Sequence, residues 1–243
     1  TGSKKYYKFA DFIKSKNMKK INVFYRICPY TSPRSIFVDI DKLTQTKLCL
    51  ASFWEAFKGV AYKITFILDS CPPIYKHEIK RLFAGEKTFY EAENMGNIGS
   101  YLKQIELASK LKDKEKVYFA EDDYIYLPEA GEKLQNALDL CEFVTLYDHP
   151  DYYHAPHLTD DHIEIYDNEQ QWISRMSTCL TFGTRAGLIK KNRKLLEKYG
   201  VNDFAMWCEM TKTHNLFSPS PSLATHAVIG LLAPNINWHI QNG

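Results

Sequence analysis

The chain has 243 residues, 45% of them hydrophobic, with 31 Lys and Arg against 29 Asp and Glu and a formal charge of +2. This hydrophobic content supports a sizeable core and excludes disorder over most of the length. The basic residues are scattered along a nearly neutral chain, so we do not expect a nucleic-acid partner.

The six cysteines, at positions 28, 49, 71, 141, 179 and 208, show no short paired spacing such as C-x-x-C. Several lie in apolar runs, so we expect reduced thiols in a cytoplasmic protein rather than disulfides or a zinc knuckle. No apolar run approaches the roughly 18–20 residues of a membrane span, and no signal peptide is visible, so we expect no transmembrane segment. The initial "TGS" (1–3) reads as a tag remnant, and the abrupt end at "HIQNG" is consistent with a domain excised from a longer protein.

Strands and helices alternate in the first half of the chain. Apolar runs predict the strands, and amphipathic stretches bounded by glycine or proline predict the helices. In chain order we predict a strand at 21–27, a helix at 46–59, a strand at 61–69, a helix at about 74–84, a turn at 94–100 leading into a helix, a strand at 116–122 and a helix at about 128–140. This alternation predicts an α/β fold with a Rossmann-type, mostly parallel central sheet flanked by helices.

The second half of the chain is richer in loops. We predict a strand at 142–150, a strand and then a helix start within 174–189, a short helix at 201–212 and a Pro/Ser-rich loop at 218–227. No internal repeat or flexible linker is visible, so we expect one domain over 1–243.

Three consecutive carboxylates, Glu121, Asp122 and Asp123, end the predicted strand "KVYFAED". Ligands of open parallel sheets bind beyond the carboxyl ends of the strands, so these side chains are expected to face a cleft. Crowded oxygen ligands suit a hard divalent cation, Mn²⁺ or Mg²⁺, which also holds a substrate phosphate. The alternative is a solvated strand end that caps the next helix.

Other residues with polar chemistry are predicted at the same edge of the sheet. Asp69 closes the second strand, where it could accept hydrogen bonds from a nucleobase, and Arg26 nears the end of the first strand. The turn "MGNIGS", with Asn97 and Gly99, offers a helix N-terminus whose free N–H groups bind anions. Together these residues predict a site for a nucleoside diphosphate.

The motifs also carry a family resemblance. The chain resembles the GT-A-fold glycosyltransferases, and more narrowly the small glycosyltransferases of large DNA viruses, including the chlorella-virus capsid glycosylating enzymes, and of some bacteria. The matching stretches run from about residue 21 to 238 and are "FYRI", "KLCLASFWEAF", "ITFILD", "GNIGSYLKQIELA", "VYFAEDDYIYLP", "FVTLYDHPDYY", "STCLTFGTR", "NDFAMW" and "PSPSLATH". The resemblance implies a GT-A-like fold, with a nucleotide-binding half at about 20–125 and an acceptor half at about 126–243.

The resemblance also implies roles for single residues. Asp123 would bind the metal that bridges the donor phosphates, and His226 of "ATHA" would contact the metal or the diphosphate. Glu121 and Asp122 would contact the ribose or the water shell of the metal. Arg26 and Asp69 would bracket the nucleobase and ribose, with Asp69 facing a uracil.

Sugar transfer with inversion needs a carboxylate that takes the proton from the acceptor hydroxyl. Our candidate is Asp203, at the start of the helix "VNDFAMW", and the second candidate is Asp148 in "YDHP". A structural explanation for Asp203 also exists, because aspartate is a favoured N-cap residue.

The segment 149–166 is rich in histidine and tyrosine. Its spacing of His149, His154, His157 and His162 matches no regular zinc pattern, while Tyr152 and Tyr153 suit stacking on a sugar. We expect an acceptor-binding loop rather than a second metal site.

These observations and the resemblance predict a metal-dependent glycosyltransferase, and the resemblance implies that it inverts. It would move a hexosyl or deoxyhexosyl group from a nucleotide sugar, expected to be a UDP-sugar, to a glycan or glycoprotein acceptor, in the host cytoplasm if the source is viral. One alternative is a sugar nucleotidyltransferase, although the loop "RICPYTSPRS" (26–35) has no glycine where such enzymes carry a Gly-rich, basic signature. A non-catalytic carbohydrate-binding domain is the other.

Overall fold

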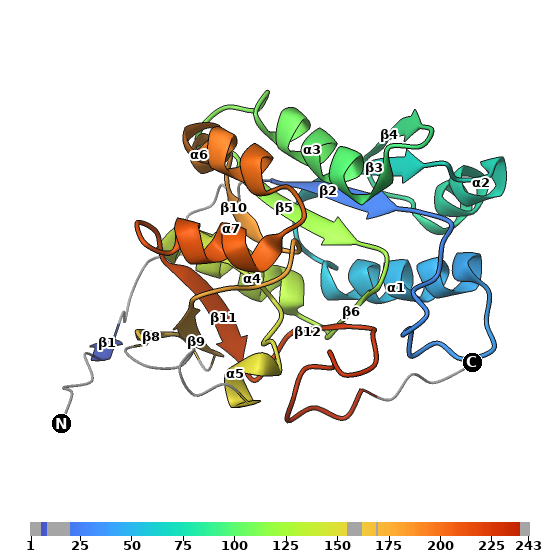
Figure 1. The fold of residues 1–243 in the computed structure, drawn as a ribbon. Coiled ribbons are helices and arrows are strands. Elements are labelled where there is room, and N and C mark those ends of the chain that lie inside the picture. The colour runs from blue at the N-terminus through green and yellow to red at the C-terminus, as the bar shows by residue number, and fades with distance from the viewer. Residues whose placement is uncertain (1–5, 9–19, 155–161, 169, 239–243) are drawn as a thin grey trace.

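The computed structural model of the protein describes residues 6–8, 20–154, 162–168 and 170–238. Its strands are β1 (Tyr6–Lys8), β2 (Ile21–Ile27), β3 (Tyr62–Asp69), β4 (Lys87–Ala92), β5 (Lys116–Glu121), β6 (Tyr124–Tyr126), β7 (Phe143–Val144), β8 (Glu164–Asp167), β9 (Gln170–Arg175), β10 (Gly183–Arg185), β11 (Leu216–Ser220) and β12 (Ala224–His226). Within the described ranges, ten strands form one sheet in the order β1-β8-β9-β11-β7-β10-β5-β2-β3-β4 (Figure 1). Strands β6 and β12 form a separate antiparallel pair.

The first half of the chain forms the parallel part of the large sheet. Strand β2 pairs in parallel with both β3 and β5, and β3 pairs in parallel with β4. Helical crossovers join strands of this kind, which explains why their sequences are almost continuously apolar. The predicted α/β fold with a mostly parallel central sheet is confirmed.

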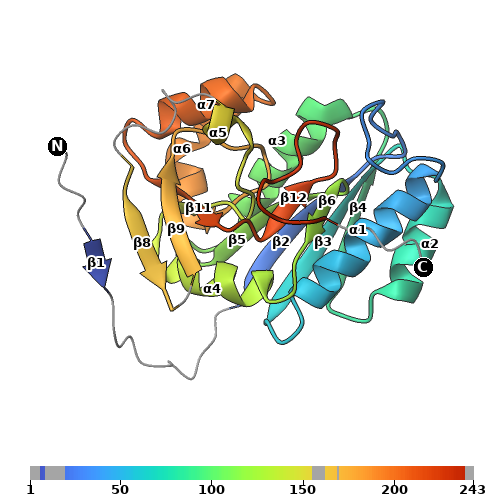
Figure 2. The same cartoon turned by 90° about the horizontal axis from the view of Figure 1, so that it is seen from below.

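The second half completes the sheet with mixed directions. Strand β10 is antiparallel to β5 and β7, and β9 is antiparallel to β8 and β11, whereas β11 and β7 are parallel. Because β2, β3 and β5 run in the same direction, their carboxyl ends meet at one edge of the sheet. Segments from the end of the chain lie next to this edge (Figure 2).

Helices cover both faces of this sheet (Figures 1 and 2). They are α1 (Lys42–Ala56), α2 (Pro73–Leu82), α3 (Gly96–Ala108), α4 (Ala130–Leu140), the single turn α5 (Asp151–His154), α6 (Ala186–Tyr199) and α7 (Asp203–Met210). Alternate strand residues supply the two cores: Val23 and Tyr25 join the cluster with α1, α2 and α4, and Phe24 joins the cluster with α3, α6 and α7. None of these helices combines the length and apolar character that crossing a membrane requires.

Two predicted helix boundaries were wrong. Helix α1 begins at Lys42 instead of residue 46, because Asp41 accepts the Thr44 N–H at 2.9 Å and provides the N-cap. Helix α3 already begins at Gly96, so most of the predicted turn at 94–100 is its first turn.

The later elements also differ from prediction. The strand predicted at 142–150 is reduced to β7, because the chain then turns away into the loop before α5. The segment 218–227 is not one loop: it contains the end of β11 and all of β12. Strand β12 pairs with β6, which the sequence did not predict, and this small sheet packs beside α1 (Figure 2).

The contact between α4 and the end of α1 depends on a glycine. A Cβ atom on Gly131 would lie 2.8 Å from Phe57 Cγ and 2.9 Å from the Ala56 carbonyl oxygen. We expect Gly131→Ala to lower the free energy of unfolding by about 1–3 kcal/mol, although alanine normally stabilises a helix relative to glycine. Urea denaturation would measure this, with the exposed Glu132→Ala on the same helix as a control expected within about 0.5 kcal/mol of the parent. A stabilised Gly131→Ala protein would contradict the close approach.

Candidate functional site

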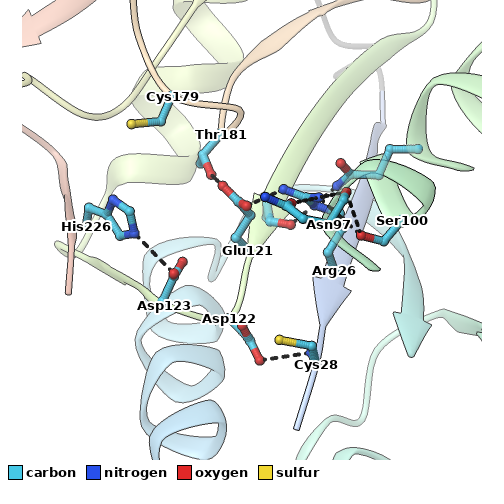
Figure 3. Close-up of polar contacts among 12 residues, drawn as sticks. Arg26, Cys28, Asn97, Ser100, Glu121, Asp122, Asp123, Cys179, Thr181 and His226 are labelled. Atoms are coloured by element: carbon cyan, nitrogen blue, oxygen red, sulfur yellow. Dashed lines mark hydrogen bonds and ion pairs between the residues drawn. The ribbon is translucent and has the colours of Figure 1, made fainter. Parts of the chain in front are cut away.

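Each of the three consecutive carboxylates pairs with a different cation. Figure 3 shows Arg26 beside Glu121 and His226 beside Asp123. Glu121 pairs with Arg26 of β2, Asp122 with Lys42 of α1, and Asp123 with His226 of β12. The cations come from elements far apart in the chain, and they offset the repulsion among adjacent negative charges. The acid motif is thus the place where these elements are joined.

The Glu121 pair is tied to the start of helix α3. The Arg26 side chain is only 6% exposed. Its Nη1 donates to the Asn97 carbonyl oxygen at 2.9 Å, to Asn97 Oδ1 at 2.7 Å and to Ser100 Oγ at 3.2 Å. On the other side, the Thr181 hydroxyl donates to Glu121 Oε2 at 2.9 Å. Arg26 and Asn97 therefore do come together. The Arg26 Nη atoms are engaged by Asn97, Ser100 and Glu121, while its buried Nε has no partner among the described residues.

Asp122 faces the interior instead of the predicted ribose. Lys42 Nζ lies 3.0 Å from Oδ1, and Oδ2 accepts the Thr46 hydroxyl at 3.2 Å and the Cys28 N–H at 3.3 Å. Burial raises the pKa of Asp122 to about 6, against the opposing effect of the Lys42 charge. This carboxylate attaches the end of β5 to α1.

Asp123 and His226 form the third pair, across the β6–β12 ladder. His226 is the register partner of Tyr124 and stacks on its ring, with centroids 4.8 Å apart. Its Nε2 lies 3.1 Å from Asp123 Oδ2 although the two residues are 103 positions apart. Burial lowers the pKa of His226, but the Asp123 charge and hydrogen bond outweigh it and raise this pKa to about 11. Burial likewise opposes ionisation of Asp123, yet His226 holds its pKa below the ordinary value.

In the third pair, the acid keeps an oxygen without a partner among the described residues. Asp123 Oδ1 and His226 Nδ1 are buried and have no hydrogen-bond partner among the described residues. No group of three potential protein ligands occurs in that part of the chain, so an ion here would take two protein ligands. Mg²⁺ and its relatives commonly use one or two protein groups and complete their shell with water and substrate phosphate. A carboxylate oxygen suits Mn²⁺ or Mg²⁺, whereas imidazole is more typical of softer ions such as Zn²⁺. The 3.1 Å separation joins Asp123 Oδ2 and His226 Nε2, which hydrogen-bond to each other, so this bond must open before both side chains could ligate one ion.

Asp203 is the first residue of α7, and it is not the N-cap. Asn202 takes that place and accepts the Ala205 N–H at 3.3 Å. The Asp203 carboxylate accepts only the adjacent Phe204 N–H, at 2.8 Å, among the bonds recorded for the described residues. Burial raises the pKa of Asp203, the Glu121 charge raises it further and the His226 charge lowers it. Asp203 thus lies within electrostatic range of the acid motif.

The surroundings of Asp148, the second candidate for the base, weigh against that role. Its side chain is 2% exposed, and Oδ1 accepts from Arg175 Nη2 at 2.9 Å and from Ser218 Oγ at 3.1 Å. The Tyr153 hydroxyl donates to Oδ2. With both oxygens engaged, Asp148 joins β9, β11 and α5.

Asp69, predicted to face a nucleobase, binds the backbone at the start of α3 instead. Its Oδ1 accepts the Met95 N–H at 2.9 Å and its Oδ2 accepts the Gly96 N–H at 2.7 Å. The carboxylate therefore occupies the positive N-terminus of α3 that we had predicted to hold a phosphate. Gly99 lies inside that helix, where an added Cβ would be 3.0 Å from Met95 Cβ.

The histidines of the predicted acceptor loop do not form a metal cluster within the described residues. His149 packs against the rings of Tyr147 and Tyr152, while His162 lies beside Glu164. His157 lies outside the described residues. Tyr153 is 46% exposed and available for stacking, whereas Tyr152 is buried beneath Arg175.

Three residues of the site were not predicted from the sequence: Lys42, Thr181 and Arg175, which hold Asp122, Glu121 and Asp148. Only Lys42 left a signal. A lysine in the first turn opposes the helix dipole, so its charge requires a partner from elsewhere.

Comparison with known proteins supports the fold. No family model matches the sequence, and no curated protein matches it. The structure of the galactosyltransferase LgtC in complex with donor and acceptor sugar analogues is similar, with a TM-score of 0.52 and 6% identity, over 81% of this chain and 72% of that one. At this identity the likeness extends to the fold alone, which is a GT-A-like, Rossmann-type arrangement of a mostly parallel sheet flanked by helices.

Two nucleotidyltransferase structures show a weaker likeness. The 4-diphosphocytidyl-2C-methyl-D-erythritol synthase from Anaerococcus prevotii has a TM-score of 0.49 and 12% identity, over 83% of this chain and 86% of that one. The CMP:2-keto-3-deoxy-manno-octonic acid synthetase complexed with CTP has a TM-score of 0.47 and 10% identity, over 82% and 88%. Both values are too low to bear on the choice between the two enzyme classes.

The buried Asp122–Lys42 pair predicts a pH dependence of stability. The pKa of Asp122, about 6, exceeds its ordinary 3.8, so the native state binds this proton more tightly than the unfolded state. Stability from this group is therefore fully present below about pH 4 and is lost as the pH rises through about 6. We expect the unfolding free energy of the parent, relative to Lys42→Met/Asp122→Asn, to fall by about 1–3 kcal/mol from pH 4 to 7.

Urea denaturation at several pH values would measure this difference. Asp113→Asn is the control, because that carboxylate is 74% exposed and should give a difference independent of pH. A difference for the double variant that stays constant or grows with pH would contradict the burial of Asp122.

Proposed function

We propose that the protein is a metal-dependent, inverting glycosyltransferase that uses a nucleotide sugar. The observation that carries the proposal is the Asp123–His226 pair at the carboxyl end of the central strand, with one polar atom of each residue unpartnered in the described part of the chain. Asp123 ends the acid motif that follows β5, and the fold is one on which nucleotide-sugar chemistry occurs. The donor is proposed to be a UDP-sugar and the acceptor a glycan or glycoprotein.

Asp123 and His226 would hold Mn²⁺ or Mg²⁺. When bound, the cation supplies positive charge that neutralises the departing nucleoside diphosphate without proton transfer. Arg26 and Thr181 keep Glu121 in place beside this pair, and Lys42 keeps Asp122 out of the site. The choice of uridine rests on the family resemblance, because Asp69 is engaged by the backbone of α3.

Asp203 would act as the general base. Inversion requires the acceptor hydroxyl to attack from the side opposite the leaving group, so the base must lie across the site from the metal pair. Burial raises the pKa of Asp203, which makes its carboxylate a stronger base, and this carboxylate is less engaged than that of Asp148.

A sugar nucleotidyltransferase is the alternative class, and a specific contact weighs against it. The loop after β2 does not present its basic residue to a substrate: Arg34 Nη2 donates to the Ile229 carbonyl oxygen at 2.6 Å. The Ile36 N–H likewise bonds to the Ala227 carbonyl oxygen at 3.1 Å. Formation of a nucleoside-diphosphate sugar from CTP or UTP and a sugar 1-phosphate would support this alternative.

Binding of UDP tests the metal site. We expect isothermal titration with Mn²⁺ to give micromolar affinity for UDP, and EDTA or Asp123→Asn to weaken it at least about tenfold. His226→Ala should have a similar effect. Formation of the metal complex should also release a proton, because His226, with a pKa of about 11, must become neutral to ligate.

Asp113→Asn again serves as the matched control, since this exposed carboxylate pairs only with surface Lys190 in the described structure. Binding of UDP that is indifferent to EDTA and to Asp123→Asn would overturn the metal assignment. A complete lack of binding by UDP and UDP-sugars would overturn the proposed donor.

If Asp203 is the base, its replacement should slow turnover and leave UDP binding unchanged. Asp203→Asn should slow release of UDP from UDP-sugars by about 10²–10⁴-fold, because it removes the proton acceptor, while UDP binds as before. Coupled detection of free UDP, with water as the acceptor, would measure this. Glu209→Gln, on the exposed side of the same helix, is the control. Equal turnover by Asp203→Asn and the parent would exclude Asp203 as the base.

A further inference from the structure

Helix α1 carries apolar residues on two opposite faces. Its inner face, which includes Leu50 and Phe53, packs into the core. Its outer face includes Leu48, Ala51 and Trp54; Ala51 is exposed and Trp54 is 39% exposed. Figure 2 shows α1 lying between α2 and the small β6–β12 sheet. A surface helix normally carries polar residues on its outer side, so this apolar face requires an explanation.

Two apolar hollows flank the outer face of α1. The first, of about 310 Å³, lies between α1 and the end of α2, and its lining includes Trp54, Leu82 and Phe83. The second, of about 220 Å³, lies beside β6, and its lining includes Ile125. Leu48 lines both hollows, so the apolar surface continues across the helix. Contiguous exposed apolar surface with charged residues at its border is typical of an interaction site.

The charges on this face are placed symmetrically about Ala51. Lys47 lies four residues before it and Glu55 four residues after it, so the three residues form one i±4 row along the helix. Lys47 Nζ lies 3.4 Å from Glu78 Oε2, and Glu55 Oε2 lies 3.6 Å from Lys58 Nζ. Both distances are longer than a good hydrogen bond, and ion pairs at the surface contribute little. Both charges can therefore exchange these partners for others.

Such symmetry suits two copies of α1 related by a two-fold axis. The commonest class of helix packing aligns the i±4 rows of both helices at a crossing angle of about 50°. When the two copies cross at Ala51, the row of one copy runs antiparallel to the same row of the other. Lys47 of each copy then meets Glu55 of the second copy. The small Ala51 side chain at the crossing point allows a close approach of the two helices.

We infer that the outer face of α1 is the interface of a homodimer, in which two Lys47–Glu55 ion pairs between the copies flank an apolar centre. Leu48, Ala51 and Trp54, with the two hollows beside them, form this centre. A second copy fits better than a foreign partner, because opposite charges at equal distances from one small residue make the face complementary to itself. The interface goes beyond the proposed function and needs neither nucleotide nor metal.

Sedimentation velocity of the intact chain at about 1–100 µM tests the interface. We expect the parent to form a dimer with a Kd of about 10 µM or lower. Lys47→Glu and Glu55→Lys should each weaken dimerisation at least about tenfold, because each places like charges opposite one another at two points. Lys212→Glu, which reverses a lysine 66% exposed just after α7, is the matched control and should leave the Kd within about twofold of the parent.

A mixture of the two charge variants distinguishes this interface from any other. In a heterodimer of Lys47→Glu with Glu55→Lys, opposite charges face each other again at both points. An equimolar mixture should therefore dimerise within about threefold of the parent, although each variant alone does not. Ala51→Arg places a long charged side chain at the crossing point and should abolish dimerisation. Its circular dichroism should match the parent, because position 51 is exposed.

A parent that stays monomeric at about 100 µM would overturn the inference. A dimer that persists in both charge variants and in Ala51→Arg would also overturn it, because the contact would then lie on another surface. Failure of the mixture to dimerise would exclude the antiparallel pairing of Lys47 with Glu55. A monomeric parent that binds anilinonaphthalene sulfonate, with binding lost in Trp54→Lys, would assign this face to an apolar ligand instead of a second copy.

Discussion

The pairing of three adjacent carboxylates with three separate cations is the constraint on which the site depends. Glu121, Asp122 and Asp123 follow one another at the end of β5, where unpaired buried charges would be strongly destabilising. Arg26, Lys42 and His226 neutralise them from β2, α1 and β12. Each pair fixes a different element against the end of the central strand, so the motif organises the fold at this edge as well as the chemistry proposed there.

The three pairs have different consequences because their surroundings differ. Glu121 and Asp122 have their oxygens engaged by hydrogen-bond donors of the chain. Asp123 and His226 each keep one buried polar atom without a partner in the described structure. Arg26 Nε is also buried without a partner among the described residues, so the Asp123–His226 pair differs from the other two in that its acid, and not only its cation, keeps a free atom.

The other candidate residues also differ in how far the protein itself engages their polar atoms. Arg26, Asp69 and Asp148 look like ligand-binding residues in sequence, yet each is engaged by the protein: by α3 and Glu121, by the N-terminus of α3, and by Arg175 with Ser218. Asp203 is less engaged because Asn202 provides the helix cap.

The sequence alone determined the parallel part of the fold and the chemical identity of the acid motif. The strands at 21–27, 62–69 and 116–121 are largely apolar runs, and local composition is enough to predict such elements. Only the tertiary structure decided which cation meets which carboxylate. His226 reaches Asp123 through the β6–β12 pairing, across 103 residues, and Asp69 reaches the N-terminus of α3 from a neighbouring strand. A residue type states which bonds a side chain is able to make, but the partners that occupy it come from chain-distant contacts, which no local pattern encodes.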